Sequence, residues 1–179
     1  TTISGNSVID LGAGDNFFTF APATGSPGFL GNHSYKGGAG PDVLVFGPNA
    51  TVEGNTAISL GEGINTFFGN TTSEYNGNFN LTVGSSANNV DMAGTVGRNL
   101  SITFGNGTGN SLNFSGSVGG VFKYRTGNGN LNTFNLTPSV PTGIFLIARF
   151  GSGSASFTLN ANLHLAGKVI GKGGSYSFL

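Results

Sequence analysis

The chain of 179 residues has no cysteine, which excludes a disulfide framework and any metal site built on thiolates. Only 8% of the residues are charged, and seven basic side chains balance seven acidic ones, so we expect no nucleic-acid partner. No apolar run approaches the roughly 18 residues of a membrane-spanning helix, and we therefore expect no membrane span.

Glycine and phenylalanine are abundant instead, with 33 and 16 residues. Together with frequent Asn, Ser and Thr, they suit tight corners and pleated strands rather than helices. The apolar residues are regularly spaced, which argues against a disordered chain. The composition therefore predicts an all-β fold.

A glycine-rich motif recurs along the whole chain, and its clearest copy is GNGTGNSLNF at residues 105–114. The steps between the first glycines of successive copies are 26, 23, 23, 21, 22, 24 and 20 residues. A nearly fixed period of this length is typical of a solenoid. The eight copies begin at Gly12, Gly38, Gly61, Gly84, Gly105, Gly127, Gly151 and Gly171.

Apolar residues alternate with polar ones around each copy, as in half-buried strands. Around Gly105 the alternating sets cover residues 100–104, 112–114 and 118–119. We therefore predict a parallel β-solenoid (β-helix) of about eight coils, with roughly 23 residues and three short strands per coil, as a single domain over residues 1–179. A β-sandwich of hairpins is disfavoured because hairpins do not require a constant motif period.

Two segments depart from the regular pattern, and the shorter one, residues 137–143 with Pro138 and Pro141, predicts a smaller version of the loop at residues 21–36. Residues 21–36 carry Pro22 and Pro27, make the first repeat the longest and predict a loop insertion that contains His33. Residues 75–80 are polar and rich in Asn, which predicts a corner, and we also expect His164 at a corner.

Asn or Asp recurs at nearly the same place after each corner. Stacked amides form hydrogen bonds along a column, and Asn tolerates the left-handed backbone of corners, so we predict a structural ladder. The last two copies place Ser156 and Ser175 at this position. The predicted rungs are Asn16, Asp42, Asn65, Asn89, Asn110 and Asn132.

The segment GGAGPDVLV, residues 37–45, matches the repeat of calcium-binding β-rolls and makes Asp42 the one candidate metal ligand. Calcium requires several oxygen ligands per ion, whereas the other repeats carry Asn or Ser in place of Asp. Because β-rolls also repeat every nine residues, we expect no metal and no cofactor.

Catalytic constellations are not evident in the sequence. Glycoside hydrolysis needs paired carboxylates, but the seven acidic residues share no repeat offset. The two histidines, His33 and His164, lie near opposite ends of the chain, so we predict no enzyme and no catalytic residue. Ice binding is a further alternative, although the threonines form no regular column.

Eight Asn-x-Ser/Thr sequons are possible glycosylation sites, and this composition produces several by chance. They begin at Asn32, Asn49, Asn70, Asn80, Asn99, Asn106, Asn113 and Asn135.

Charge is segregated along the chain. Residues 1–91 carry one basic and seven acidic side chains, a net charge of −6, and residues 92–179 carry six basic and no acidic ones, a net charge of +6. In a solenoid this places an acidic half on a basic half, and we expect such asymmetry to steer association.

The two ends of the chain are in phase with each other. Joining residue 179 to residue 1 of a second copy places Gly12 20 residues after Gly171, which equals the last internal step. Neither end carries an obvious cap, and uncapped strand edges favour addition of another strand. The predicted assembly residues are Ile3, Val8, Ile9 and Leu11 at one end and Lys168, Lys172, Tyr176 and Phe178 at the other.

The segment VGRNLSITFGNGTGNSLNFSGSVGG, residues 96–120, resembles repeats of large secreted bacterial β-solenoid proteins, namely planctomycete-type surface repeats and adhesin-like solenoids. This resemblance implies a secreted, extracellular or cell-surface location and a structural or adhesive role, and it transfers no catalytic residue. Our leading hypothesis is a fibre or matrix subunit that assembles head to tail. The alternatives are an adhesin that binds glycans or a cell surface, and, less favoured, a polysaccharide-active enzyme.

Overall fold

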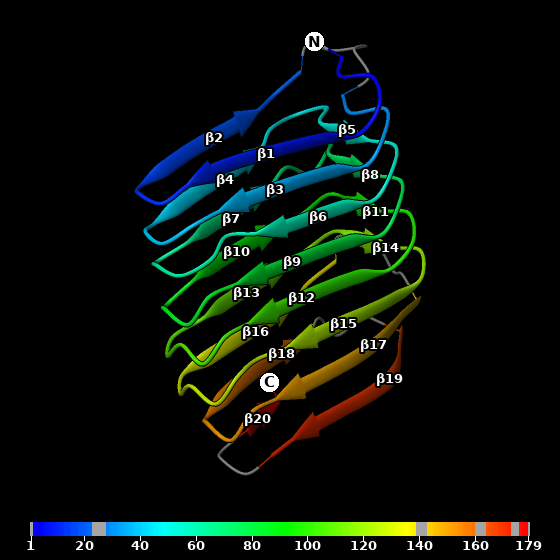
Figure 1. Cartoon of the computed structure of the whole chain (residues 1–179). Coiled ribbons are helices and arrows are strands. Elements are labelled where there is room, and N and C mark those ends of the chain that lie inside the picture. The colour runs from blue at the N-terminus through cyan, green and yellow to red at the C-terminus, as the bar shows by residue number, and fades with distance from the viewer. Residues whose placement is uncertain (1, 23–27, 139–142, 160–163, 173–175, 179) are drawn as a thin grey trace.

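The computed structural model describes residues 2–22, 28–138, 143–159, 164–172 and 176–178, and within these residues the regular elements are all β-strands. Every strand pairs in parallel with its neighbours (Figure 1). The chain winds as a β-solenoid of about six turns with about 23 residues per turn. The predicted all-β fold and parallel solenoid are therefore confirmed.

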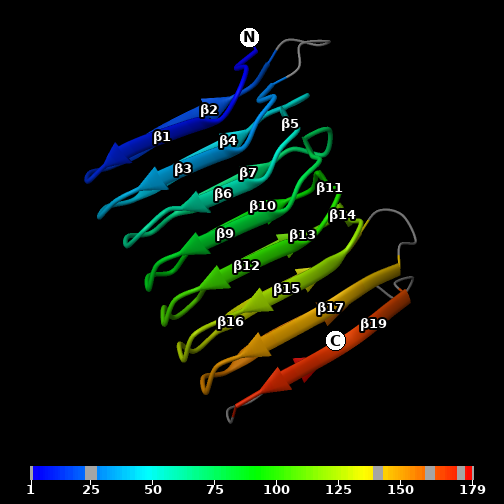
Figure 2. The same cartoon turned by 45° about the vertical axis from the view of Figure 1, so that its right-hand side comes forward.

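Two sheets of eight strands each extend along the stack (Figure 2). The first consists of β1 (Ser7–Gly12), β3 (His33–Gly37), β6 (Thr56–Ser59), β9 (Phe79–Val83), β12 (Leu100–Phe104), β15 (Val121–Arg125), β17 (Gly143–Phe150) and β19 (His164–Gly171). The second consists of β2 (Asn16–Phe20), β4 (Asp42–Phe46), β7 (Thr66–Gly69), β10 (Asn89–Met92), β13 (Ser111–Phe114), β16 (Asn132–Leu136), β18 (Ala155–Leu159) and β20 (Tyr176–Phe178).

The third side of the solenoid is shorter. Its four strands have two residues each, and isolated bridges at Ile3 and Phe29 extend it to six positions. The predicted eight coils with three strands each are therefore not confirmed, and residues 139–142 of the predicted loop over residues 137–143 lie outside the described residues. The strands are β5 (Thr51–Val52), β8 (Glu74–Tyr75), β11 (Thr95–Val96) and β14 (Ser117–Val118).

The core consists of apolar columns between the three sides. Strand alternation points every second side chain inward, as in β12 and β16, where buried and half-buried residues alternate. Aromatic rings from different sides meet inside the stack, and the rings of Phe134 and Phe157 lie 4.8 Å apart on successive coils. Regular burial of this kind holds each coil on the next.

Gly69 shows how one coil adjusts to its neighbours. Its column otherwise holds large residues, with Phe46 before it and Met92 after it. A Cβ atom at Gly69 would lie 3.2 Å from the hydroxyl oxygen of Tyr75 on the third side. The tyrosine thus occupies the volume that a large residue in the second sheet fills in other coils.

The prediction of a loop insertion over residues 21–36 is wrong for most of the described part of this segment. Phe29 is buried on the third side, and His33 begins β3 with only 1% of its surface exposed. Pro27 lies outside the described residues. The segment is longer than its equivalents, but most of its described part follows the regular path of the coil.

Two further sequence-based predictions need correction. Tyr75 is a buried strand residue of β8, so the corner predicted over residues 75–80 is confined to the residues before β9. His164 begins β19 and pairs with Gly143 in the sheet rather than lying at a corner. The strand β8 has only two residues and is flanked by polar, Asn-rich segments, so the sequence showed no alternating pattern there.

Candidate functional site

A buried ladder of side-chain amides follows the corner between the first and second sheets. The main-chain N–H of Asp42 donates to Oδ1 of Asn65, at 2.9 Å, and the N–H of Asn65 donates to Oδ1 of Asn88, at 3.0 Å. Nδ2 of Asn65 also donates to the carbonyl oxygens of Gly61 and Gly63. Each rung thereby satisfies buried polar groups of its own corner and of the neighbouring coil.

The predicted rung Asn89 is wrong, and Asn88 takes its place. Asn88 is buried and accepts the N–H of Asn65, whereas Asn89 is exposed on the outer face of β10. The predicted Ser156 is wrong too, because Ala155 pairs with Asn132 and leaves this coil without an amide. Ser175 lies outside the described residues, and the rungs observed are Asn16, Asp42, Asn65, Asn88, Asn110 and Asn132.

Asp42 is a buried carboxyl within this ladder. Its Oδ1 accepts a hydrogen bond from Nδ2 of Asn16, at 2.8 Å, and its Oδ2 has no hydrogen-bond partner. Burial raises the pKa of Asp42, although hydrogen bonds from Asn16 and the N–H of Gly38 oppose this effect. Asp42 is a rung of the ladder because it bonds to Asn16 on one side and Asn65 on the other. Among the described residues no three His, Asp or Glu side chains gather.

A second ladder, which sequence reasoning missed, lies at the corner between the third and first sheets. The N–H of Asn55 donates to Oδ1 of Asn32, at 2.8 Å, and the N–H of Asn78 donates to Oδ1 of Asn55, at 3.0 Å. The sequence signal was present, because the rungs recur with the same steps as the glycine motif. The rungs are Asn6, Asn32, Asn55, Asn78 and Asn99.

The eight sequons occupy different environments. Asn32 and Asn99 are rungs of the second ladder, and Asn106 accepts the N–H of Asn128 at another corner. Asn80 is exposed on the outer face of β9. The remaining four lie on the second sheet or at the corner that follows it: Asn49, Asn70, Asn113 and Asn135.

His33 and Ser7 form a hydrogen bond between the first two coils. Ser7 Oγ lies 2.9 Å from His33 Nδ1, and the imidazole stacks on the ring of Phe29 at 4.0 Å. Burial lowers the pKa of His33 to about 4, and its Nε2 has no partner. No carboxylate of the described residues accepts a hydrogen bond from this imidazole, so the pair lacks the orienting group of a catalytic triad.

We call the outer edge of β1 and β2 the open edge, because among the described residues no strand pairs with it (Figure 1). Ile9, Leu11 and Phe18 are inward-facing but only partly buried, because among the described residues no coil lies beyond them. Nothing in the described residues donates to Oδ1 of Asn16, whereas the equivalent atom of Asn65 accepts an N–H. Apolar columns and the buried ladder therefore both continue to this edge.

The predicted end residues differ in where they lie. Ile3 is a half-buried residue of the third side. Val8 is not part of the core column, since 75% of its surface is exposed and its register neighbours lie on the outer face. At the opposite end, Tyr176 pairs with Ala155 and Phe178 with Phe157.

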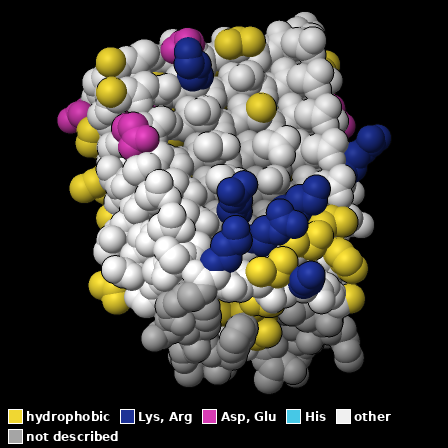
Figure 3. Space-filling model, turned by 60° about the horizontal axis from the view of Figure 1, so that its bottom comes forward, with side chains coloured by type: hydrophobic (Ala, Val, Ile, Leu, Met, Phe, Trp, Pro, Cys, Tyr) yellow, Lys and Arg dark blue, Asp and Glu magenta, His cyan; other side chains and the backbone are white. Residues whose placement is uncertain are grey.

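Lys168 and Lys172 do not lie on the axis of the stack. Both are exposed, and Lys168 pairs with Ile147 on the outer face of the first sheet. Lys and Arg side chains gather on one lateral face in the C-terminal half (Figure 3). The charge segregation of the sequence thus becomes a basic patch on one side of the solenoid.

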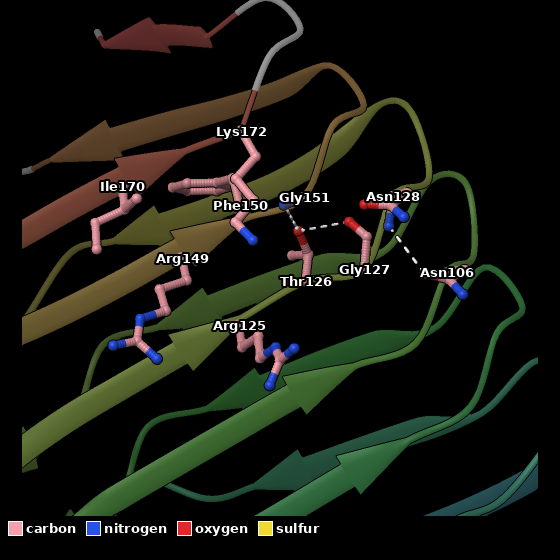
Figure 4. Close-up of a pocket in the computed structure, with 10 residues that line it drawn as sticks. All are labelled: Asn106, Arg125, Thr126, Gly127, Asn128, Arg149, Phe150, Gly151, Ile170 and Lys172. Carbon is pink, nitrogen blue, oxygen red and sulfur yellow. Dashed lines mark hydrogen bonds between the residues drawn. The ribbon is translucent and has the colours of Figure 1, made fainter.

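This face is hollowed along the first sheet. One hollow of about 560 Å³ is lined by Arg125, Arg149 and Lys172 together with Asn106 and Asn128. In Figure 4 the two arginines project from the neighbouring strands β15 and β17, and Lys172 lies beyond them. A second hollow of about 400 Å³ is lined by the same two arginines, so the two hollows adjoin each other.

No helix among the described residues is long and apolar enough to cross a membrane. Comparison of the chain with protein-family models, with curated proteins and with solved structures gives no match.

Proposed function

We propose that this chain is a structural solenoid subunit of an extracellular fibre or matrix, which grows when a second copy adds coil on coil to the open edge of β1 and β2. The observation that carries the proposal is the state of the first coil. Its apolar columns and its amide ladder have the same form as inside the stack, and both end without a partner in the described residues.

The interface needed for this growth already occurs between neighbouring coils of the chain. There, parallel strands pair along both sheets, and inward residues such as Leu44, Phe67 and Val90 are fully buried. An incoming coil would bury Ile9, Leu11 and Phe18 in the same way. Burial of apolar area at about 25 cal/mol per Å² would favour the addition.

Charge supports one orientation of the second copy. If the column register of the first sheet continues across the joint, Lys168 of one copy lies beside Val8 of the next, and Ile170 lies beside Asp10. The cation therefore comes near a carboxylate. Asp10 already forms an ion pair with Lys36, at 3.4 Å, and both side chains are exposed, so the contribution of this contact is small.

A proline at the open edge tests the proposal. Ser7 donates its N–H to Asn32 of the next coil, so strand alternation directs the N–H of Val8 towards the open edge. Val8→Pro removes this donor and leaves the observed pairing intact, whereas the control Val8→Thr retains it. We expect light scattering to show concentration-dependent assembly for the wild type and Val8→Thr, and its loss in Val8→Pro. Equal assembly of all three proteins, or none in any, contradicts the proposal.

A further inference from the structure

The outer face of the first sheet carries a groove that runs along several coils. The two basic hollows share Arg125 and Arg149, and a third hollow of about 470 Å³ shares Ser101 and Lys123 with one of them. A fourth hollow of about 270 Å³ continues beyond Asn80 towards the N-terminal end. A depression that extends over many equivalent strands fits a linear polymer better than a compact ligand.

Strand register arranges the side chains of the groove in two columns. One column runs Thr103, Arg125, Arg149 and Ile170, and the other runs Ser101, Lys123, Ile147 and Lys168. Successive members of a column are about 4.8 Å apart, and the columns are two residues apart on each strand, about 6.6 Å. The C-terminal part of the groove therefore presents regularly spaced cations next to aliphatic side chains.

These cations have no acidic neighbours in the chain. Every Asp and Glu lies at or before residue 91, and the one ion pair in the described part of the chain joins Lys36 to Asp10. Lys123, Arg125 and Arg149 are exposed. A guanidinium group binds the planar carboxylate or sulfate of a ligand through two parallel hydrogen bonds.

Neutral polar groups complete the groove. Asn106 and Asn128 expose their amides at its edge, and among the described residues their Nδ2 atoms make no hydrogen bond. Further towards the N-terminus the lining includes Ser59, Asn80 and Thr82, and its one charged side chain is Lys36. Amide and hydroxyl groups of this kind match the hydroxyl groups of sugar rings.

From this arrangement we infer that the groove binds a linear acidic polysaccharide, which lies along the axis of the stack. Its carboxylate or sulfate groups contact Lys123, Arg125, Arg149 and Lys172, and its hydroxyl groups contact the Asn and Ser/Thr side chains. The aliphatic surfaces of Ile147 and Ile170 pack against the C–H faces of the sugars.

Nucleic acid fits the same charges less well. Single strands are held by bases that stack on exposed aromatic rings. The aromatic residues that line the basic hollows, Tyr124 and Phe150, are buried, and the exposed Phe145 of β17 lines neither hollow. An acidic polysaccharide needs no such stacking surface.

The test is equilibrium binding to polymers of known chemistry, measured in the Val8→Pro background so that assembly does not contribute. The probes are polygalacturonate for carboxylates, chondroitin sulfate for sulfates, neutral dextran, and single-stranded DNA. We expect binding to at least one acidic polysaccharide, weaker binding to DNA and none to dextran. Tighter binding to DNA than to both acidic polysaccharides, or no binding to either of them, overturns the inference.

Matched charge variants locate the site. Arg125→Gln with Arg149→Gln should weaken polysaccharide binding at least tenfold and flatten its salt dependence, because two ligand contacts are lost. Arg98→Gln is the control, since Arg98 is exposed outside the groove, and it should change affinity less than twofold. If affinity falls equally per removed charge in the double variant and in Arg98→Gln, the polymer is attracted to net charge alone and the proposed site is wrong. Circular dichroism spectra that match the wild type ensure that each variant is folded.

Ligand length gives a third measurement. The groove from Ser101 to Ile170 covers the four strands β12, β15, β17 and β19. At the usual strand spacing this is about 14 Å along the axis. Affinity for galacturonate oligomers should rise with length until the oligomer spans these strands and then level off. Affinity that does not change between the monomer and a long oligomer contradicts a polymer that lies along the groove.

Discussion

At most corners between the first and second sheets one Asn side chain satisfies donors and acceptors that the turn leaves open. Asn65 accepts the N–H of Asp42 and donates to two corner carbonyl oxygens. An unsatisfied buried polar group costs about 1–3 kcal/mol, so the amides are required wherever the corner excludes water. Positive φ at Gly61, +72°, shows that the same corner also needs glycine, since a Cβ atom there would meet the carbonyl oxygen of Gly38.

The assignment of Asn88 rather than Asn89 to the ladder predicts different effects of two neighbouring substitutions. Asn88→Ala removes hydrogen bonds to buried main-chain groups and should lower the free energy of unfolding by about 1–3 kcal/mol. Asn89→Ala is the matched control on the exposed face and should change it by less than about 0.5 kcal/mol. Urea denaturation measures both, and equal effects would show that the rung is misassigned.

His33 predicts a loss of stability in acid. Its pKa is lowered from 6.5 to about 4 in the folded state, so the unfolded chain binds a proton first as the pH falls. The stabilising contribution of neutral His33 is therefore present above pH 6.5 and lost as the pH falls towards 4. Relative to the wild type, His33→Phe should gain about 2 kcal/mol in free energy of unfolding between pH 7 and 4. Parallel pH profiles for the two proteins would contradict this prediction.

Asp42 predicts the opposite pH dependence. Its folded-state pKa lies above the ordinary value of 3.8, so the neutral carboxyl is favoured in the folded state and stability is lost as the pH rises through that pKa. Asp42→Asn has no proton to lose. The free energy of unfolding of the variant relative to the wild type should therefore rise from pH 3 to pH 7, as measured by urea denaturation. A difference that falls over this range would show that the carboxylate form is favoured in the fold.

At the scale of strands and corners, the motif period predicted the two long sheets well. The alternation around Gly105 became β12 and β13 in the expected phase. Burial on one face of each strand fixes which residues point inward, so a period-2 pattern is informative there. The third side was harder to predict because its strands have only two residues, too few for a pattern to repeat.

Corner length explains the ladder error. Asn65 and Asn88 lie four positions after Gly61 and Gly84, whereas Asn110 lies five positions after Gly105. An offset of five after Gly84 gives Asn89, but the spacing of two between a rung and the next inward residue, as in Asn65 and Phe67, gives Asn88. The loop predicted over residues 21–36 was a second error, which came from the two prolines of the long first repeat. Burial of Phe29 and His33 keeps that part of the chain in the stack.

At the scale of the whole molecule, the basic half of the chain supplies a lateral surface in addition to the end-to-end attraction that the sequence suggested. Lys123, Arg125 and Arg149 lie on the side of the solenoid, where they line a groove. Axial growth and lateral binding therefore use different surfaces, so a fibre of this subunit would repeat the groove along its length.

The most direct test of coil-on-coil growth is cryo-electron microscopy of the wild-type protein at high concentration, in low and in high salt. Coil-on-coil growth predicts unbranched filaments in which strands lie across the axis and the coil spacing of about 4.8 Å runs unbroken from one subunit to the next. Separate monomers in both salts, or filaments in which the solenoid axis lies across the fibre, would contradict it.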